Sequence, residues 1–317
     1  MTILRRVRLL AALGVAAALI AASAIAQSRT VARIFVTGAG ARLVEQGIAG
    51  AAPSDTSGFQ EVPSPGVRYL PNVARATNVP WIDSNGWRFA RGLRNANYAK
   101  VPAGSAALAA AEAFVFSIDA IVDPDPKDVE DLGAMLRFIR SQAAPPMPEL
   151  VNIGVVDDGS PVMGEVLNLL TRRNLLFRVV KKPDPGLDLN VQLGTSDFPS
   201  EAAANPYEFA ARVRTKLGDD KRLVRLYGTN TVIARLTGDA KRARLYLLAF
   251  GARRQQENAG SQAFRVRLVG RYRPLKFSGY GAANEATLGD LRNPGNTTEF
   301  WVPDFRICAV IDLERIV

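Results

Sequence analysis

The sequence predicts an α/β protein, in which a region with a parallel sheet is followed by a C-terminal antiparallel β-sandwich. First, strand-like and helix-like segments alternate with short connections between residues 151 and 217, the order that builds parallel sheets. Second, the hydrophobic pattern changes to period two after Gly218, as in half-buried antiparallel strands. Third, 48% of the residues are hydrophobic, which is enough for a substantial core.

The first 26 residues have the composition of a signal peptide. Arg5, Arg6 and Arg8 precede an apolar run from Leu9 to Ile20, and a stretch of small residues ends at Ala26. A basic start, an apolar middle and an A-x-A site are typical of export signals. We therefore expect cleavage near Ala26 and a secreted or periplasmic protein. No later segment approaches the ~20 apolar residues of a spanning helix, so no transmembrane segment is expected after cleavage.

Two features of the composition limit the chemistry. The chain has no histidine, which excludes Ser-His-Asp and Cys-His catalysis and histidine-ligated zinc. Its single cysteine, Cys308, lies in an apolar run and is expected to be a buried thiol. We therefore expect no cofactor, no metal and no internal disulfide, and acid–base chemistry must come from Asp and Glu. The net charge, +10 for the whole chain and +7 without the three signal arginines, does not indicate a nucleic-acid partner.

Residues 27 to 78 are predicted to be a loop-rich segment. Ala32 to Val36 is a candidate short strand, and Thr37 to Gly40 begins like a nucleotide-binding turn. Leu43 occupies the position of the third glycine, however, and the helix, strand and acidic residue of a dinucleotide site do not follow. Dinucleotide binding is therefore not expected.

Residues 79 to 145 are predicted to be a partial barrel-like βα region. Its expected elements are an extended segment, an alanine-rich helix, a buried strand and an amphipathic helix, at Val79 to Phe89, Ala103 to Phe116, Ala120 to Val122 and Lys127 to Arg140. The last helix follows from apolar residues at i, i+3 and i+4 spacing. Three prolines between Ala143 and Pro148 indicate a linker.

The remaining chain is predicted to be an α/β domain at residues 149 to 218 and a β-sandwich at residues 219 to 317. The elements of the α/β domain are expected at Val151 to Val156, Val162 to Arg173, Leu175 to Val180, Leu189 to Leu193 and Pro206 to Leu217. The sandwich strands are expected at Leu223 to Tyr227, Thr231 to Leu236, Arg244 to Phe250, Ala263 to Val269 and Phe305 to Leu313. Arg265 and Arg267 alternate with apolar residues, which indicates a solvated sheet face; binding of anionic glycans or envelope lipids is the alternative.

The run Val151-Asn152-Ile153-Gly154-Val155-Val156-Asp157-Asp158, its helix and the strands from Leu223 on resemble the back half of certain secreted glycoside hydrolases. In that family, which includes β-galactosidases with a trimerisation domain, a TIM-like barrel precedes a glutamine-amidotransferase-like domain and a small β domain. The resemblance covers about residues 79 to 317 by architecture. It implies glycoside-hydrolase-like descent without amidotransferase activity, because the cysteine, histidine and glutamate of that site have no counterparts here. Fewer residues precede Val79 than the ~200 or more of a complete barrel, so we expect a catalytically reduced protein.

Residues Pro80 to Phe89 include two of the three tryptophans. If this segment is extended, Trp81, Asp83, Asn85 and Trp87 share one face. Aromatic faces stack on sugars while Asp and Asn bind hydroxyls, so these residues, with Arg88, are a candidate carbohydrate subsite. The alternative is that the tryptophans belong to the core and the polar residues satisfy backbone groups.

Asp83 and Asp123 are the candidate catalytic carboxylates. Glycoside hydrolysis uses two carboxyl groups ~5 to ~9 Å apart, and we expect this pair at neighbouring strand ends. The alternative is that Asp123 and Asp125 form the turn around Pro124 and Pro126.

Asp157 and Asp158 follow a predicted parallel strand, at the end where ligands usually bind. They are candidate ligand-binding residues. The alternative is that Asp158 or Ser160 caps the next helix, with Pro161 at its first position.

Two functions are therefore open. The first is an exported carbohydrate-handling protein of glycoside-hydrolase-like descent: a reduced carboxylate-based hydrolase or a glycan-binding remnant. The second is a non-catalytic cell-envelope protein that binds a ligand or assembles through its β-sandwich. The second function predicts a large apolar or basic exposed surface on the sandwich.

Overall fold

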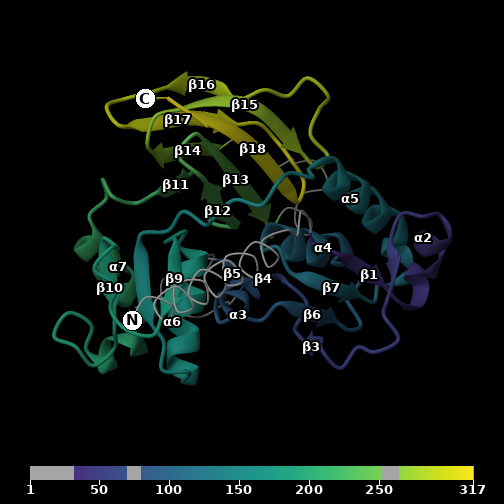
Figure 1. The fold of residues 1–317 in the computed structure, drawn as a ribbon, viewed down its shortest axis with the longest axis horizontal. Helices are drawn as coiled ribbons and strands as arrows, with labels where there is room; N and C mark the ends of the chain where they lie inside the picture. The colour runs from purple at the N-terminus through teal and green to yellow at the C-terminus, as the bar shows by residue number, and fades with distance from the viewer. Residues whose placement is uncertain (1–31, 70–79, 252–263, 317) are drawn as a thin grey trace, which may run out of the picture.

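The computed structural model describes residues 32–69, 80–251 and 264–316 (Figure 1). The expected signal peptide, with its cleavage site near Ala26, lies outside the described residues. None of the helices in these three ranges is both long and apolar enough to cross a membrane. Parallel sheets come first along the chain and two antiparallel sheets follow as a sandwich, which confirms the predicted fold class. In Figure 1 the sandwich lies above two α/β units that stand side by side.

The first parallel sheet draws strands from the loop-rich segment and from the region after it. Its strands are β1 (Ile34–Val36), β2 (Gly50–Ala51), β3 (Gln60–Glu61), β6 (Asn95–Tyr98) and β7 (Asp119–Val122). Their order is β2-β1-β7-β6-β3, and the central strand β7 is buried along its whole length. The segment expected to be mostly loop therefore supplies an inner strand, β1, to this sheet.

Short elements complete this first unit around the sheet. They are η1 (Gly38–Gly40), α2 (Ala41–Glu45), the antiparallel pair β4 (Gly66–Tyr69) and β5 (Pro80–Asp83), α3 (Gly86–Ala90) and η2 (Pro126–Asp128). The pairing of β4 with β5 is separate from the five-stranded sheet among the described residues. As a result, β5 and β7 do not lie in one sheet.

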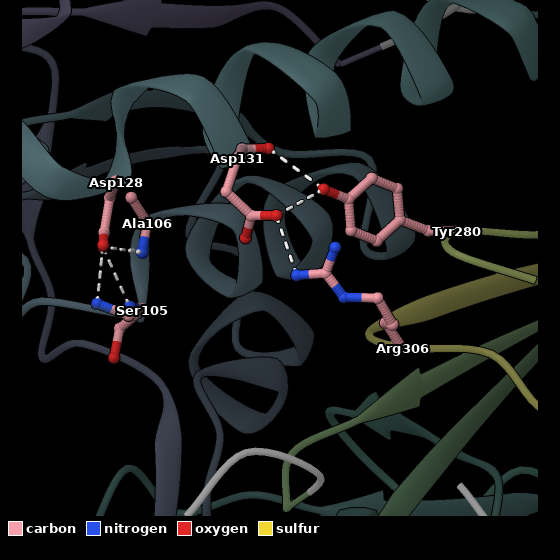
Figure 2. Close-up of polar contacts among 7 residues, drawn as sticks. Ser105, Ala106, Asp128, Asp131, Tyr280 and Arg306 are labelled. Atoms are coloured by element: carbon pink, nitrogen blue, oxygen red, sulfur yellow. Dashed lines mark hydrogen bonds and ion pairs between the residues drawn. The ribbon is translucent and has the colours of Figure 1, made fainter. Parts of the chain in front are cut away.

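Helix α4 (Ala106–Val115) is buried at every position, as expected for a helix that is apolar on all sides apart from Glu112. It contacts β7 on one side and the sandwich strand β13 (Arg242–Ala249) on the other. Its N-terminus is held by Asp128, whose carboxylate accepts hydrogen bonds from the backbone N–H groups of Gly104, Ser105 and Ala106 (Figure 2). A negative charge here satisfies free N–H groups and complements the helix dipole.

The amphipathic helix α5 (Val129–Ser141) joins the first unit to the sandwich. Asp131 accepts hydrogen bonds from the Tyr280 hydroxyl at 2.7 Å and from Arg306 at 2.8 Å (Figure 2). Burial, helped by the hydrogen bond to Asp131, raises the pKa of Tyr280, so its hydroxyl stays protonated and donates. The apolar positions of α5 that the sequence identified, Val129, Leu132, Met135, Leu136 and Ile139, are all buried.

The second α/β unit is a small parallel sheet with helices. It contains β8 (Ile153–Val156), α6 (Pro161–Arg172), β9 (Phe177–Val180), β10 (Leu189–Val191), η3 (Ser200–Ala204) and α7 (Pro206–Leu217), with strand order β10-β8-β9. Helix α6 begins where the sequence predicted, because the Ser160 hydroxyl accepts from the N–H of Met163 and Pro161 takes the first position. The capping alternative for Ser160 is confirmed.

The sandwich consists of two four-stranded antiparallel sheets within the described residues. One sheet has the order β12-β13-β18-β15 and the other β11-β14-β17-β16. The strands besides β13 are β11 (Val224–Tyr227), β12 (Val232–Gly238), β14 (Phe264–Val269), β15 (Tyr272–Gly279), β16 (Gly289–Arg292), β17 (Thr297–Val302) and β18 (Cys308–Arg315).

The sheet β12-β13-β18-β15 is covered on both faces. Leu245 and Ile311 pack in the core between the two sheets, whereas Leu248 and Cys308 pack with α4 in the core of the first unit. This explains why β13 and β18 each contain a run of apolar residues on both faces, Leu245 to Ala249 in β13, with Tyr246 partly buried, and Cys308 to Ile311 in β18: strands that are buried on both sides lose the alternation of polar and apolar residues.

The prediction that Val79 to Phe89 is one extended segment is wrong for its second half. Strand β5 ends at Asp83 and helix α3 begins at Gly86; Val79 lies outside the described residues. Strands β2, β3, β4, β6, β15, β16 and β17 were also not predicted from the sequence. Strand β15 contains Pro274 and has a register shift beside it, which hides it from a search for regular alternation.

Candidate functional site

The corner between β5 and α3 is held by a buried carboxylate, Glu112 of α4. Its Oε1 accepts from the Ser84 hydroxyl and the Asn85 N–H, both at 2.8 Å. Its Oε2 accepts from Asn85 Nδ2 at 2.9 Å and from the Tyr98 hydroxyl at 2.8 Å. Asn85 is 1% exposed, so its side chain serves the fold and is closed to an external ligand in this conformation.

Glu112 is fully buried, and the burial raises the pKa of its carboxyl group, while the hydrogen bonds from Asn85 act in the opposite direction. The four hydrogen bonds donated to its two oxygens offset part of this desolvation. The sequence did carry one signal for this role. Glu112 is the single charged residue in the otherwise apolar α4, and a lone charge in a buried helix requires partners.

The two tryptophans do not share one face with Asp83 and Asn85, as the extended segment had predicted. Trp81 stacks with Arg172 of α6, whose guanidinium carbon lies 3.5 Å from the ring centroid. Trp87, on α3, packs against α6 at Gly164, where an added Cβ would lie 3.1 Å from the indole. Both rings therefore help to join the first unit to α6. Arg88 contributes to the same corner by stacking on Trp87 and donating to Asn85 Oδ1.

The candidate catalytic carboxylates lie on different pieces of structure. Asp83 pairs with Arg68 across the β4–β5 hairpin, with one contact of 2.7 Å between Nη2 and Oδ1. Asp123 follows β7 at the carboxyl end of the five-stranded sheet, and its Oδ1 is so close to Gly38 that a Cβ there would lie 2.3 Å away. The expectation that they end neighbouring strands is wrong, because β5 and β7 are in separate sheets. Their catalytic role itself stays a prediction.

Asp157 and Asp158 lie at the carboxyl end of β8, as expected. Asp157 forms a bidentate ion pair with Arg91, both contacts being 2.8 Å. Asp158 accepts from the N–H of Ser160 at 2.8 Å, and hydrogen bonding with the Ser160 side chain, followed by this backbone hydrogen bond, lowers the pKa of Asp158. Asp158 is exposed and Asp157 is largely enclosed. Ligand binding by either residue stays a prediction.

A cavity of about 890 Å³ lies where the two α/β units and the sandwich meet. We call it the junction cleft. Its walls come from the α3–β6 connection, the end of α4, the linker before β8, strand β9 and strand β12; the lining residues with aromatic or charged side chains are Phe89, Arg94, Phe116, Glu149, Phe177, Arg178 and Arg235. Its volume falls in the usual range of small-molecule sites, ~300–1,000 Å³. None of the site residues predicted from the sequence lines it.

Two sheet edges face each other across the junction cleft. Strand β9 is the outer strand of the small parallel sheet, and β12 is the outer strand of its sandwich sheet. Asn174 follows the C-terminus of α6 and has a positive φ of +54°. Its side chain binds the edge of β12: Nδ2 donates to the Val232 carbonyl at 3.0 Å, and Oδ1 accepts from the Ala234 N–H at 2.6 Å. The Asn174 side chain therefore links the segment after α6 to the edge of β12.

Arg235 forms the charged part of the wall contributed by β12. Its Nε donates to Glu149 Oε1 at 2.8 Å, and its Nη1 donates to the Ser117 hydroxyl at 3.0 Å and to the carbonyl of Val115. The guanidinium thus joins the sandwich to the linker and to the end of α4. No sequence pattern indicated this group, because Arg235, Glu149 and Ser117 come from three distant segments.

The described part of the chain contains no group of three or more His, Cys, Asp or Glu side chains arranged to hold a metal ion.

Comparisons with known proteins identify the architecture. No protein-family model and no curated protein sequence matches the chain. The fold is similar to that of α-L-fucosidase isoenzyme 2 from Paenibacillus thiaminolyticus, with a TM-score of 0.53 and 9% sequence identity over 70% of this chain and 60% of the fucosidase. An α-amylase from H. orenii aligns with a TM-score of 0.22, at 14% identity over 67% of this chain and 35% of the amylase.

The likeness to the fucosidase concerns the fold alone, given the 9% identity, and the chain spans about 60% of that enzyme's length. It agrees with the order of parallel α/β units and antiparallel sandwich described above. The fold of this chain is therefore similar to that of a solved α-L-fucosidase, which agrees with the architectural resemblance stated from the sequence.

Proposed function

We propose that the protein is an exported glycan-binding protein of glycoside-hydrolase-like descent, and that the junction cleft holds the glycan. The observation that carries this proposal is a cavity of about 890 Å³ in a chain with glycoside-hydrolase-like architecture. The basic, apolar and A-x-A pattern of residues 1–26 supports export. Export would bring the protein into contact with extracellular or envelope glycans.

The lining of the junction cleft suits a sugar. Phe89, Phe116 and Phe177 supply flat apolar surface, and Arg94 and Arg178 supply donors at the border of the cavity. Sugars combine apolar C–H faces with hydroxyl groups, so they use both kinds of contact. Mixed apolar walls with a few fixed polar groups are typical of ligand sites.

Binding without cleavage is the form of the proposal that the carboxylates favour. Glycoside hydrolysis places two carboxyl groups on opposite sides of the scissile bond, ~5 to ~9 Å apart. Among the described residues that line the cleft, Glu149 is the single carboxylate, and its Oε1 already accepts a hydrogen bond from Arg235. Asp83 and Asp157 are engaged by Arg68 and Arg91 elsewhere.

The proposal is tested by screening the full mature chain on a glycan array, with Arg94→Gln as the cleft variant. Arg94 is exposed, so the variant should fold normally. We expect its affinity for the best-bound glycan to fall about tenfold, the effect of losing a charged hydrogen bond. Arg137→Gln is the matched control, because Arg137 is also exposed but lies on α5 away from the cleft.

Equal binding by the Arg94→Gln variant and the wild type would contradict the location of the site. Release of reducing sugar from the bound glycan by the wild-type protein would contradict the non-hydrolytic form of the proposal. Phe177→Ala provides an independent second variant on the β9 wall, and it should lose affinity as well.

A further inference from the structure

The outer face of the sheet β11-β14-β17-β16 presents two exposed aromatic rings in one cross-strand row. Tyr227 lies opposite Arg265, and Arg265 lies opposite Trp301. Tyr227 is 38% exposed and Trp301 is 41% exposed. Adjacent strands lie ~4.8 Å apart, so the two aromatic residues are separated by about 10 Å across the sheet, with the Arg265 side chain between them. We call this row, with its neighbouring arginines, the sandwich face.

The inner side of these strands already provides the core. Val266, Phe300 and Val302 are buried between the two sheets. Trp301, on the opposite side of its strand, is not part of that core. Gly289 lies opposite Trp301 on the edge strand β16, and without a side chain there the ring has free space beside it. The other sandwich sheet, through Leu248 and Cys308, is the one that packs into the core of the first unit. An exposed aromatic patch of this kind is typical of a binding surface.

A second row on the same face is mostly basic. Arg225, Arg267, Glu299 and Arg292 lie opposite one another in that order. Glu299 forms ion pairs with both Arg265 and Arg267, which hold the two guanidinium groups beside the rings.

Acidic residues at the border reduce this charge without cancelling it. Asp219 pairs with Arg225 and Asp290 pairs with Arg292. The two rows contain four arginines and one carboxylate, that of Glu299. Glu299 is shared by Arg265 and Arg267, so these two arginines keep a net positive charge. The face therefore complements a ligand that is flat, extended and negatively charged.

We infer that the sandwich face binds an acidic polysaccharide that carries carboxylate groups, such as a polyuronate. Tyr227 and Trp301 stack on the C–H faces of sugar rings along the chain, and Arg265 and Arg267 bind the carboxylates between them, as guanidinium groups do with planar anions. A flat sheet face suits an extended polymer better than a small molecule, which needs a cavity. The inference deepens the proposed glycan binding but uses a different surface from the junction cleft.

The test is affinity electrophoresis of the full mature chain through gels that contain polygalacturonate or, as the neutral comparison, dextran. We expect polygalacturonate to retard the wild type and dextran to have no effect through this face. Trp301→Ala should weaken polygalacturonate binding about tenfold, as for a single aromatic hot spot. Arg265→Gln should weaken binding and reduce its dependence on salt concentration, because an ionic contact is lost.

Leu275→Ala is the matched control for loss of an exposed apolar side chain, since Leu275 is 55% exposed but belongs to β15 of the other sheet. It should bind like the wild type. Tyr227→Ala should reproduce the Trp301→Ala result, which guards against a local folding defect at Trp301. Unchanged polygalacturonate binding in both aromatic variants would overturn the inference, as would equal retardation by dextran. Tighter binding of a single-stranded oligonucleotide, which also favours aromatic and basic surfaces, would overturn it too.

The Arg94→Gln variant separates this inference from the junction cleft. If it loses its array glycan but keeps polygalacturonate binding, both sites stand. If the cleft variants have no effect on any glycan while Trp301→Ala abolishes polygalacturonate binding, the cleft proposal fails and the sandwich face stands.

Discussion

Asn85 and Glu112 are joined by two hydrogen bonds, from the backbone N–H of Asn85 at 2.8 Å and from its Nδ2 at 2.9 Å. The asparagine ends the turn after β5, and the glutamate lies in the middle of the buried helix α4. This pair turns the chain out of the strand and into α3. It thereby brings Phe89 and Ala90 of α3 to the wall of the junction cleft.

Replacing Glu112 by glutamine should destabilise the protein. In either orientation the amide nitrogen of the introduced glutamine would face an N–H group of Asn85, either Nδ2 or the backbone N–H, so two buried donors would meet without an acceptor. We expect a loss of about 3 kcal/mol in the free energy of unfolding, measured by urea denaturation. Glu130→Gln on α5 is the matched control, since Glu130 is exposed, and it should stay within about 0.5 kcal/mol of the wild type. A similarly small effect for Glu112→Gln would show that the network does not stabilise the fold.

The stabilisation by Glu112 should depend on pH in a defined direction. Burial raises its pKa in the folded protein, so the folded state binds this proton more tightly than the unfolded chain. The corresponding stability is fully present below the unfolded pKa of about 4.3 and is lost as pH rises through the higher folded pKa. The difference in unfolding free energy between the wild type and Glu112→Gln should therefore shrink as pH rises from about 4. Urea denaturation of the wild type and of Glu112→Gln at a series of pH values measures this difference. A difference in unfolding free energy that grows with pH would contradict the prediction.

Asp128→Ala should loosen the start of α4. The carboxylate accepts from Gly104 N–H at 2.7 Å, Ser105 N–H at 3.1 Å and Ala106 N–H at 3.3 Å (Figure 2). Loss of a capping side chain costs about 1–2 kcal/mol, and we expect a corresponding fall in the thermal midpoint. Asp128→Asn keeps an acceptor oxygen but loses the charge, so it should fall between the alanine variant and the wild type. Equal effects of the two variants would mean that the charge alone matters.

Cys308 should react slowly with a disulfide reagent in the native protein. It is completely buried between the sandwich and the first α/β unit, and burial raises the pKa of its thiol, so the reactive thiolate is scarce. Labelling in the native state should be at least about a hundredfold slower than in denaturant, which exposes the thiol. Asp131→Ala removes the contacts to Tyr280 and Arg306 across the same boundary and should accelerate labelling. Rapid reaction of the wild type would show that the units separate readily.

The elements predicted well are those whose signal lies within one segment. Helix α5 carries its apolar residues at helical spacing, and strand β14 alternates Arg265 and Arg267 with Val266 and Leu268. The start of α6 was marked by Ser160 and Pro161. In each of these cases, the residues that decide the structure are within a few positions of each other, so a periodic or capping pattern is sufficient.

The elements and site residues that were missed depend on distant partners. The segment from Pro80 to Phe89 reads as extended, but Glu112 folds its middle into a corner from more than twenty positions away. The junction cleft combines Arg94, Glu149 and Arg235, which no local spacing connects. Trp301 was not predicted as a binding residue, because no sequence pattern distinguishes a buried tryptophan from one on an outer sheet face.

By itself, the sequence determined the expectation of export, the α/β-then-sandwich order and the absence of histidine chemistry, because composition and local periodicity are properties of the chain. The tertiary structure decided which charged groups are paired, where the cleft lies and which aromatic rings face outward. Those properties depend on which distant segments come into contact, and contact is settled only when the whole core packs.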